Sequence, residues 1–590
     1  MSVLETPRVY FRGFTTWDPV TTNNYPRNYD EMGAQTMLTP DGKVGPFRKA
    51  AIDDVVTSGN WNPHGTYRSQ FYDTTVVGVD TGSGVSTADP FVGSPVNFMG
   101  MLVDLEPYGS MSSQLFFDSM SLGIDGAPQV RVPRAMRMIA RQINFARIPS
   151  YTCIAGLGSV VWQTSVPKGD GLPLAALGSP AIEALQRSLE DDDVLGLTVR
   201  WNAYRTVYYD NVECRNGNDV MKRESLRHRR RLRGGGFQPN PARSVLVGVL
   251  GLWRVGDAPQ VSGDRGLLQA NSGPIATATA RLTGTRLVVD FGNSVPESDS
   301  ETLAKTDYGT LNVQVGRTVI GTLPYSAYDK DAYEATAGIV TLELDSDGAA
   351  SAASGDLTIQ GADGTVYLQE ERLHVCEITP NVYVDQGESA TLQVQVLDRG
   401  QPAAAGTVVS WVTASTSAPT MRTSLTDANG VASLAVDGAS SNMIGQIDQY
   451  VATTSQQPPT VANTMTTSYL WVRTLPSGSD VAALDPTWDN VYNSVLYNWH
   501  AMAPCMDNWL DLGDEHQVAR YDAVLRKLTA KENFEAFRYM PVTRDLTAGQ
   551  RSLLYAWLDS TQGLEAAESA PAPTSGPDTH ATLSRSFRSG

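Results

Sequence analysis

The stretch that decides the fold class is SLEDDDVLGLTVRWNAYRTVYY, residues Ser188–Tyr209. Its three consecutive acids, Asp191–Asp193, lead directly into a run in which apolar side chains alternate from Val194 to Trp201. A period of two predicts a strand with one buried face, because successive side chains of a strand point to opposite sides of the sheet. The preceding residues, Pro180–Leu189, have the spacing of a short amphipathic helix. The acids are expected to cap that helix and mark the strand edge, although they could also bind a cation or serve as a general acid or base.

The same strand signature recurs through most of the chain. Strand-like segments separated by turns rich in Gly, Asp and Ser follow one another at roughly ten-residue spacing, which is typical of sandwiches and barrels. The sequence therefore predicts a mainly β protein with a multi-domain β-barrel or β-sandwich region up to about residue 370. A pair of lipocalin-like barrels is one form that this region could take, because closed barrels leave no free edges.

Composition and turns divide the chain further. We expect an N-terminal β domain over 1–240, which ends in a basic, glycine-rich loop predicted to be disordered, and a second β domain over 241–373. Residues 374–475 are expected to form an immunoglobulin-like β-sandwich, because Thr426-Asp-Ala-Asn-Gly430 resembles the T-D-x-x-G turn of bacterial immunoglobulin-like domains. Apolar residues at three- and four-residue steps predict a short C-terminal helical segment over 484–562, and 563–590 is expected to be a disordered tail. Within the segment, one helix is expected to carry Val518 to Leu528, and Thr547 with Gln550 three residues on predicts a capping box at the start of the last helix.

The bulk numbers exclude several classes of protein. Lys plus Arg total 45 and Asp plus Glu total 63, which gives a net charge of −18. This charge argues against nucleic acid and anionic membranes as partners, and no apolar stretch approaches the length of a membrane span. The sequence has no secretory signal pattern and its four cysteines form no C-x-x-C pair, so we expect a cytoplasmic protein with free thiols.

Four stretches together carry a resemblance to a known family. They are Met1-Ser-Val-Leu-Glu-Thr-Pro-Arg-Val-Tyr-Phe-Arg-Gly13, the acidic stretch quoted above, Leu246-Val-Gly-Val-Leu-Gly-Leu-Trp-Arg254 and Tyr539-Met-Pro-Val-Thr-Arg-Asp545. At these spacings they resemble the N-terminal half of chromopyrrolate-synthase-type enzymes, which couple tryptophan-derived imines in violacein, rebeccamycin and staurosporine biosynthesis. The resemblance covers roughly residues 1–560, in patches, and the C-terminal ferritin-like domain of the family is lacking.

The resemblance also bears on cofactors. The family's ferritin-like domain would hold iron through glutamates and E-x-x-H pairs, but that spacing is absent from residues 484–560, where Glu515 and His516 are adjacent. This pattern argues against a di-iron site, and no other metal site is predicted. Some enzymes of the family are associated with haem, so a haem with a histidine ligand remains an alternative.

The resemblance and the composition single out one candidate ligand-binding group. His64 lies among the aromatic residues Trp61, Tyr67, Phe71 and Tyr72, and family members are similar in having N-x-H followed by aromatics at this point. We expect either a ligand contact in an aromatic-lined cavity or a histidine packed against the backbone. Nucleophile and phosphate-binding motifs are absent, so no catalytic residue is assigned.

Two classes of function follow. The first is a secondary-metabolism protein that binds an aromatic, amino-acid-derived intermediate or supports a separately encoded ferritin-like oxidase. The second is a non-catalytic structural or interaction protein that assembles through its β modules, by self-association or with other partners. A haem-dependent oxidase is a third alternative, and if the protein is an enzyme we expect an oxidoreductase. An aromatic-lined cavity would favour the first class, and a filled β core with an exposed apolar patch would favour the second.

Overall fold

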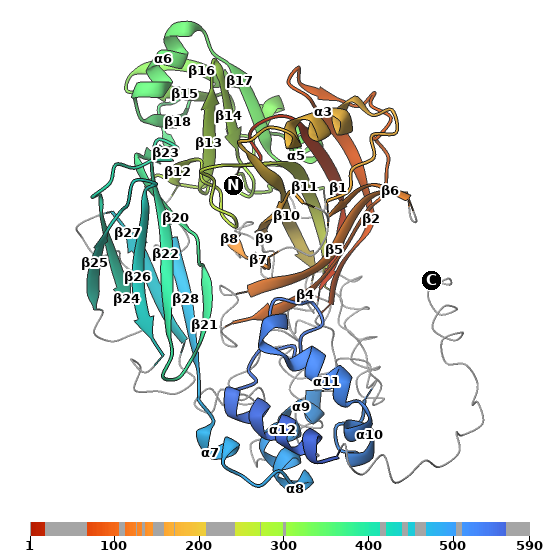
Figure 1. The fold of residues 1–590 in the computed structure, drawn as a ribbon. Helices are drawn as coiled ribbons and strands as arrows, with labels where there is room; N and C mark the ends of the chain where they lie inside the picture. Colours follow the sequence, from red (N-terminus) through yellow and green to blue (C-terminus); the bar gives the residue numbers. More distant parts are fainter. Residues whose placement is uncertain are drawn as a thin grey trace, which may run out of the picture.

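The computed structural model describes residues 2–17, 68–105, 113–124, 127–132, 136–144, 159–169, 172–207, 242–271, 273–298, 302–413, 420–438, 447–454, 468–502 and 510–561. These residues form four β-sheets and a group of helices, which confirms the predicted mainly β fold class (Figure 1). The basic loop at 215–240 and the tail at 563–590 lie outside the described residues.

An antiparallel sheet forms the first unit. Its hydrogen-bonded order is β6-β5-β4-β2-β1-β11-β10-β9-β8, with β3 paired to β2 and β7 to β5. The strands are β1 (Arg8–Trp17), β2 (Arg68–Asp80), β3 (Val85–Ser86), β4 (Val96–Asp104), β5 (Ser113–Ile124), β6 (Ala127–Val132), β7 (Met138–Ile139), β8 (Arg141–Asn144), β9 (Ser159–Pro167), β10 (Val194–Val207) and β11 (Ala242–Arg254). β11 pairs with both β1 and β10, so the first sheet extends past the boundary predicted at residue 240.

The predicted helix before the acids is confirmed as α3 (Pro180–Leu189). The Ser179 hydroxyl caps it by accepting a hydrogen bond from the backbone N–H of Ile182, and Pro180 occupies the first turn. Its apolar face, including Ile182 and Leu185, is buried against the core of the first sheet.

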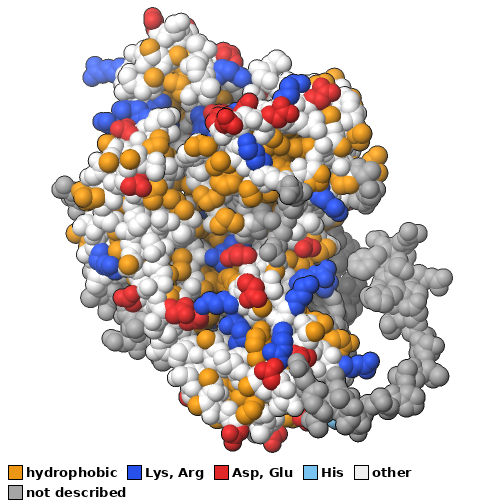
Figure 2. Space-filling model, viewed as in Figure 1, with side chains coloured by type: hydrophobic (Ala, Val, Ile, Leu, Met, Phe, Trp, Pro, Cys, Tyr) orange, Lys and Arg blue, Asp and Glu red, His pale blue; other side chains and the backbone are white. Residues whose placement is uncertain are grey.

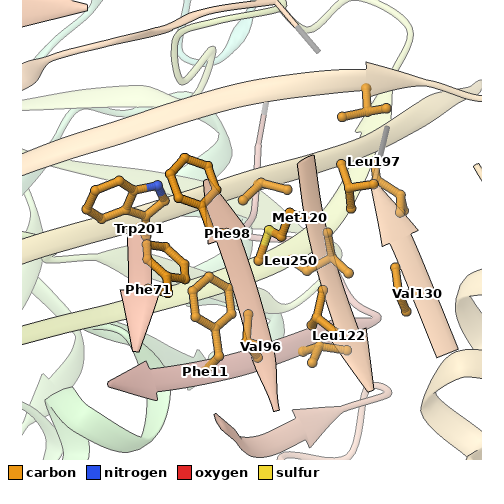
Figure 3. Packing of buried hydrophobic residues seen from close by; sticks show 14 of the residues in the cluster. Phe11, Phe71, Val96, Phe98, Met120, Leu122, Val130, Leu197, Trp201 and Leu250 are labelled. Atoms are coloured by element: carbon orange, nitrogen blue, oxygen red, sulfur yellow. The ribbon is translucent and has the colours of Figure 1, made fainter. Parts of the chain in front are cut away.

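The first sheet curls around its own core. Phe98 on β4 and Trp201 on β10 are four strands apart, which in a flat sheet would separate them by about 19 Å. Their ring centroids instead lie 5.9 Å apart, and Phe71 on β2 packs edge-on against Trp201 at 5.2 Å (Figure 3). The ring of Phe11 fills the space over Gly248, where a Cβ atom would lie 2.2 Å from the ring. The described part of this core is therefore filled by aromatic side chains.

The second unit is an eight-stranded sheet of order β16-β15-β18-β19-β12-β13-β14-β17, whose two end strands contact each other as in a barrel. Its elements are β12 (Arg265–Gln269), β13 (Ala278–Thr283), β14 (Arg286–Asp290), β15 (Leu311–Val315), β16 (Thr318–Leu323), η4 (Tyr325–Ala327), α5 (Lys330–Thr336), β17 (Ile339–Glu343), α6 (Ser346–Ser354), β18 (Leu357–Gly361) and β19 (Val366–Glu371). Buried ion pairs tie it to the outer face of the first sheet. Arg200 on β10 pairs with Asp290 on β14, and the Tyr204 hydroxyl donates to Glu334 on α5 at 2.7 Å.

The third unit is a two-sheet sandwich, as expected of an immunoglobulin-like module. One sheet has the order β20-β22-β23 with β26 on β22, and the other has the order β21-β28-β27-β24-β25. The strands are β20 (Leu373–Glu377), β21 (Asn381–Asp385), β22 (Ser389–Asp398), β23 (Gln401–Pro402), β24 (Val408–Thr413), β25 (Met421–Leu425), β26 (Val431–Asp437), β27 (Ile447–Thr453) and β28 (Ser468–Leu475). Trp411 is buried between the sheets and donates its indole N–H to the Ser424 hydroxyl at 2.8 Å.

Helices complete the chain. They are α7 (Ser479–Ala482), α8 (Trp488–Val491), the π-helical turn η6 (Tyr492–Leu496), α9 (Tyr497–Met502), α10 (Glu515–Arg520), α11 (Asp522–Thr529), η8 (Lys531–Asn533) and α12 (Ala548–Thr561). The capping box predicted for α12 is confirmed by reciprocal hydrogen bonds between Thr547 and Gln550 at 3.1 and 3.2 Å. The sequence pattern predicts one helix through Val518 and Leu528, but the backbone leaves the helical region at Tyr521 and divides it into α10 and α11.

The helical segment is not isolated from the β region. Its buried apolar residues form one cluster with Met101 and Val103 on β4 and Phe116 on β5. These three side chains lie on the outer face of the first sheet, opposite the aromatic core. The sandwich, the helical segment and the first sheet therefore meet along one junction (Figure 1).

Candidate functional site

Of the predicted aromatic group, the structure describes Phe71 and Tyr72. Trp61, His64 and Tyr67 lie outside the described residues. Phe71 and Tyr72 are neighbours on β2 and therefore face opposite sides of the first sheet. Phe71 is buried in the aromatic core, whereas Tyr72 stacks on Phe14 with ring centroids 5.3 Å apart. Within the described residues, these two side chains do not line a shared cavity.

The acidic stretch links the turn before β10 to the end of β11 through an ion pair. Asp191–Asp193 are exposed in the turn between α3 and β10. The Asp193 carboxylate pairs with Arg254 at the end of β11 at 2.5 Å, and Arg254 also pairs with Glu5 at 2.6 Å. The interpretation of the acids as a strand-edge feature agrees with this geometry.

A cavity of about 380 Å³ lies where the first sheet, the sandwich and the helical segment meet. The first sheet contributes Arg137, the sandwich contributes Asn381 and Tyr383, and the helical segment contributes Phe534 and Arg544. Acidic and basic side chains gather at the centre of the view in Figure 2, over the region where the sandwich approaches the helices. We call this space the junction cavity.

The cavity is basic in an otherwise acidic protein. Its charged lining residues are Arg137, Asp385, Glu388, Lys531, Glu535, Arg544 and Arg551. Four of these are basic and three are acidic, whereas acids outnumber bases in the whole chain. Because Arg137 pairs with Glu535 at 3.3 Å and Lys531 pairs with Asp385 and Glu388, the excess positive charge of the lining comes from Arg544 and Arg551.

Aromatic rings hold the guanidinium groups in place. The Arg137 guanidinium lies 5.6 Å from the ring centroid of Phe116, 5.7 Å from that of Tyr383 and 5.8 Å from that of Phe534. Arg544 lies closer to Phe116, at 3.6 Å. Such cation–π contacts are stronger where water is excluded, because the low dielectric strengthens the attraction.

Arg544 combines three unusual properties. Its side chain is fully buried and its Nε makes no hydrogen bond in the described structure, while its Nη atoms donate to the carbonyls of Val542 and Ala536. Burial lowers the pKa of its guanidinium to about 10, because the charged form loses solvation. Its φ angle is 57°, a left-handed conformation that non-glycine residues rarely adopt. Such backbone strain is concentrated at functional sites.

Asn381 is the second unusual residue of the cavity. Its side chain is only 3% exposed, yet neither Nδ2 nor Oδ1 has a hydrogen-bond partner in the described structure. Its backbone carbonyl, in contrast, accepts a hydrogen bond of 2.5 Å from Arg137. A buried amide with no partner costs about 1–3 kcal/mol. Among the described residues, the Asn381 amide therefore keeps unused hydrogen-bonding capacity at the cavity.

Two tyrosines complete the polar lining. The Tyr383 hydroxyl accepts from the Gln114 amide at 2.8 Å, and the Tyr539 hydroxyl accepts from Arg551 at 3.0 Å. Burial raises the pKa of both phenols, so both stay neutral donors at physiological pH.

One ion-pair group spans the sandwich and the helices beside the cavity. The Lys531 ammonium lies 3.2 Å from Asp385 and 3.3 Å from Glu388, and its pKa is raised mainly by the hydrogen bond to Asp385. Lys531 and Glu388 are largely exposed, so this pair contributes little to stability.

The chemistry available here is recognition. Guanidinium groups, neutral phenols and an unpartnered amide can bind a carboxylate and its neighbours, and the rings can flank a planar group. Among the described residues, no three His, Cys, Asp or Glu side chains are grouped to hold a metal ion. None of the described helices combines the length and apolar character needed to cross a bilayer.

Sequence reasoning missed this site because its residues are scattered along the chain from Gln114 to Arg551. They come from the first sheet, the sandwich and the helical segment. One signal was present: Tyr539–Asp545, a stretch that carries the family resemblance, contains the lining residues Tyr539 and Arg544. Nothing in the local pattern around Arg137 or Asn381 marks them.

Comparisons with known proteins give no family. No protein-family model matches the chain, and no curated protein matches it. Among solved structures, fibronectin(III)-like modules of Clostridium thermocellum CbhA align over 34% of this chain and 94% of theirs, with 10% identity and a TM-score of 0.12. Trypsin-activated alpha-2-macroglobulin from Escherichia coli aligns over 47% and 15%, with 11% identity and a TM-score of 0.14. Extracellular domains 3–5 of Drosophila OTK align over 36% and 66%, with 12% identity and a TM-score of 0.12. At these TM-scores the likeness supports no inference about function.

Proposed function

We propose that this protein binds a small planar aromatic anion in the junction cavity, as a cytoplasmic protein of secondary metabolism. The observation that carries the proposal is that Asn381 and Arg544 both line one basic cavity with aromatic walls, and that each has buried polar atoms without a hydrogen-bond partner among the described residues. An anion that accepts from both would remove the cost of leaving them unpaired.

The size of the cavity suits such a ligand. Sites for small organic molecules occupy about 300–1,000 Å³ and occur preferentially between domains. The junction cavity, at about 380 Å³, lies at the small end of that range. It can hold a ring system with one acidic group, and Tyr383, Phe534 and Tyr539 offer aromatic surface for such a ring.

The family resemblance supports the aromatic part of the proposal. The resemblance implies an aromatic, amino-acid-derived intermediate, and Tyr539–Asp545 is among the stretches on which it rests. We therefore propose that the chain is related to the front half of chromopyrrolate-synthase-type enzymes. The redox chemistry would then be carried by a separate ferritin-like oxidase.

Isothermal titration with indole-3-acetate, a stable aromatic carboxylate, tests the proposal. We expect saturable binding at one site per chain and at least ten-fold weaker binding of the neutral amide, indole-3-acetamide. The variant Asn381→Asp keeps the shape of the side chain but adds a negative charge to the cavity, so it should bind indole-3-acetate at least ten-fold more weakly.

The matched control is Asn429→Asp, which makes the same chemical change at an exposed turn of the sandwich. Its affinity should equal that of the unmodified protein. If indole-3-acetate does not bind, or if both variants lose affinity equally, the junction cavity is not the ligand site.

A second candidate function is assembly through the β modules. The filled aromatic core of the first sheet, around Phe71 and Trp201, favours it over a ligand cavity inside that sheet. The two functions use different parts of the molecule and can coexist.

A further inference from the structure

One strand of the sandwich presents a free edge. β25 is the last strand of its sheet and pairs only with β24 among the described strands. It lies at the outer edge of the sandwich, on the left of the molecule in Figure 1, away from the first sheet and the helices. Among the described residues, neither the first sheet nor the helices lie on that side of β25.

The hydrogen bonds of the hairpin show which backbone groups face outward. The N–H of Thr413 donates to the carbonyl of Thr420, and at the other end the N–H of Thr426 donates to the carbonyl of Thr407. Hydrogen-bonded pairs alternate along an antiparallel ladder, so Arg422 and Ser424 direct their backbone groups toward β24. The backbone N–H and C=O groups of Met421, Thr423 and Leu425 consequently point to the free edge.

The two end residues of β25 and one residue of β24 have exposed apolar side chains. Met421 is 55% exposed and Leu425 is 62% exposed, and Val408, which pairs with Leu425 on β24, is 49% exposed. Natural edge strands are usually protected against pairing by lysines, prolines, inward-pointing charges or bulges. β25 carries one charged side chain, the exposed Arg422, but no lysine, proline or acidic residue, and the β24–β25 register contains no bulge.

The sequence of β25 complements itself. If Thr423 lies on a two-fold axis, an antiparallel copy places Met421 opposite Leu425 and Arg422 opposite Ser424. Each outward backbone N–H and C=O group then meets its counterpart, and the exposed Met421 packs beside Leu425 of the other copy. No like charges face each other, although the whole chain has a net charge of −18.

We infer that β25 is a homodimerisation edge, through which a second copy of this chain extends the sheet β21-β28-β27-β24-β25 across a two-fold axis. The interaction is antiparallel strand addition, in which backbone hydrogen bonds supply affinity and the apolar pair fixes the register. A five-residue edge buries less area than a standard interface, so the dimer is weak and forms at high micromolar concentrations.

Sedimentation equilibrium of the full chain between about 5 and 500 µM tests this inference, with Thr423→Pro and Thr423→Ala as the variants. The N–H of Thr423 makes no bond to β24, so proline there blocks the free edge without breaking the hairpin. We expect reversible dimers in the unmodified protein and in Thr423→Ala, and only monomers in Thr423→Pro. Far-ultraviolet circular dichroism and the melting temperature check that Thr423→Pro is folded.

A cross-link provides an independent measurement. On the two-fold axis, the paired Cα atoms of residue 423 would be about 5.5 Å apart, within the range that a disulfide spans. Mild oxidation of Thr423→Cys should give a covalent dimer above the background of the native cysteines, whereas Ala353→Cys on exposed α6 should not. A protein that stays monomeric at 500 µM, or a Thr423→Pro variant that still dimerises, overturns the inference; neither result bears on the junction cavity.

Discussion

Replacing Asn381 by alanine should make the protein more stable and impair its ligand binding. The side chain is 3% exposed and neither of its polar atoms has a partner among the described residues, so the folded state bears the desolvation cost of the amide, about 1–3 kcal/mol. Alanine removes that cost and forfeits part of the packing around the side chain. The backbone carbonyl that accepts from Arg137 is unchanged. We expect a net gain of about 1 kcal/mol.

Gln114→Ala is the contrasting variant. Its Oε1 has no partner among the described residues, but its Nε2 donates to the Tyr383 hydroxyl at 2.8 Å, and removal of the side chain leaves this buried phenol without that donor. We expect a loss of about 1–3 kcal/mol. The two changes both remove a buried amide beside the same cavity, yet they should have opposite signs.

Differential scanning calorimetry measures both effects. For a cooperative unit of roughly 200 residues, a gain of about 1 kcal/mol raises the midpoint by about 2–4 °C. The transition that contains the sandwich should move up in Asn381→Ala and down in Gln114→Ala. Added indole-3-acetate should raise the midpoint of the unmodified protein but not that of Asn381→Ala. Equal destabilisation by the two substitutions would mean that the Asn381 amide is satisfied in the folded protein, and the argument for a ligand at this position would fail.

Three further predictions concern the charge of Arg544, the core of the first sheet and the first turn of α12. Because burial lowers the pKa of Arg544 to about 10, anion affinity should be constant from pH 7 to 9 and fall about ten-fold per unit above pH 10, as the guanidinium loses its proton. Affinity that stays flat to pH 11 would mean that Arg544 keeps its proton there, and it would refute the lowered pKa. The lowered pKa of Arg544 also means that its buried charge destabilises the folded state at neutral pH. This destabilisation disappears as the pH rises above 10, because the folded state then loses the proton before the unfolded state does. Trp201→Ala should cost about 3–5 kcal/mol in urea unfolding, because Trp201 packs against Phe71 in the centre of the curled sheet, and a loss below about 1 kcal/mol would mean that the core is not closed. Thr547→Ala should cost about 1 kcal/mol and speed amide hydrogen exchange in the first turn of α12, whereas unchanged exchange would contradict a role for the capping box.

Local sequence patterns were sufficient to predict several elements of the fold. The alternation after Asp193 predicted β10, the spacing of Pro180–Leu189 predicted α3, and Thr547 with Gln550 predicted the start of α12. Each of these depends on residues within a few positions of one another, where period, propensity and capping act directly. The mainly β class followed from the repetition of such signals.

The site could not be predicted in the same way. Arg137, Asn381 and Arg544 are separated by hundreds of residues and come from three units, so only tertiary packing brings them to one cavity. Their chemistry also depends on burial. A solvated arginine is an ordinary surface cation, whereas burial of Arg544 lowers the pKa of its guanidinium. The aromatic cluster predicted around Phe71 and Tyr72 illustrates the converse, because neighbours along a strand face opposite sides of the sheet.

The sequence by itself determined that this chain forms strands, where its short helices begin, and that it is acidic and mainly β. These properties follow from interactions between near neighbours and from the net charge. Only the tertiary structure decided that the first sheet curls until β4 meets β10, that β11 joins β1 to β10, and that a basic cavity forms at the junction. The physical reason is that curvature, burial and desolvation arise from contacts between residues distant in the chain, and no local pattern encodes them.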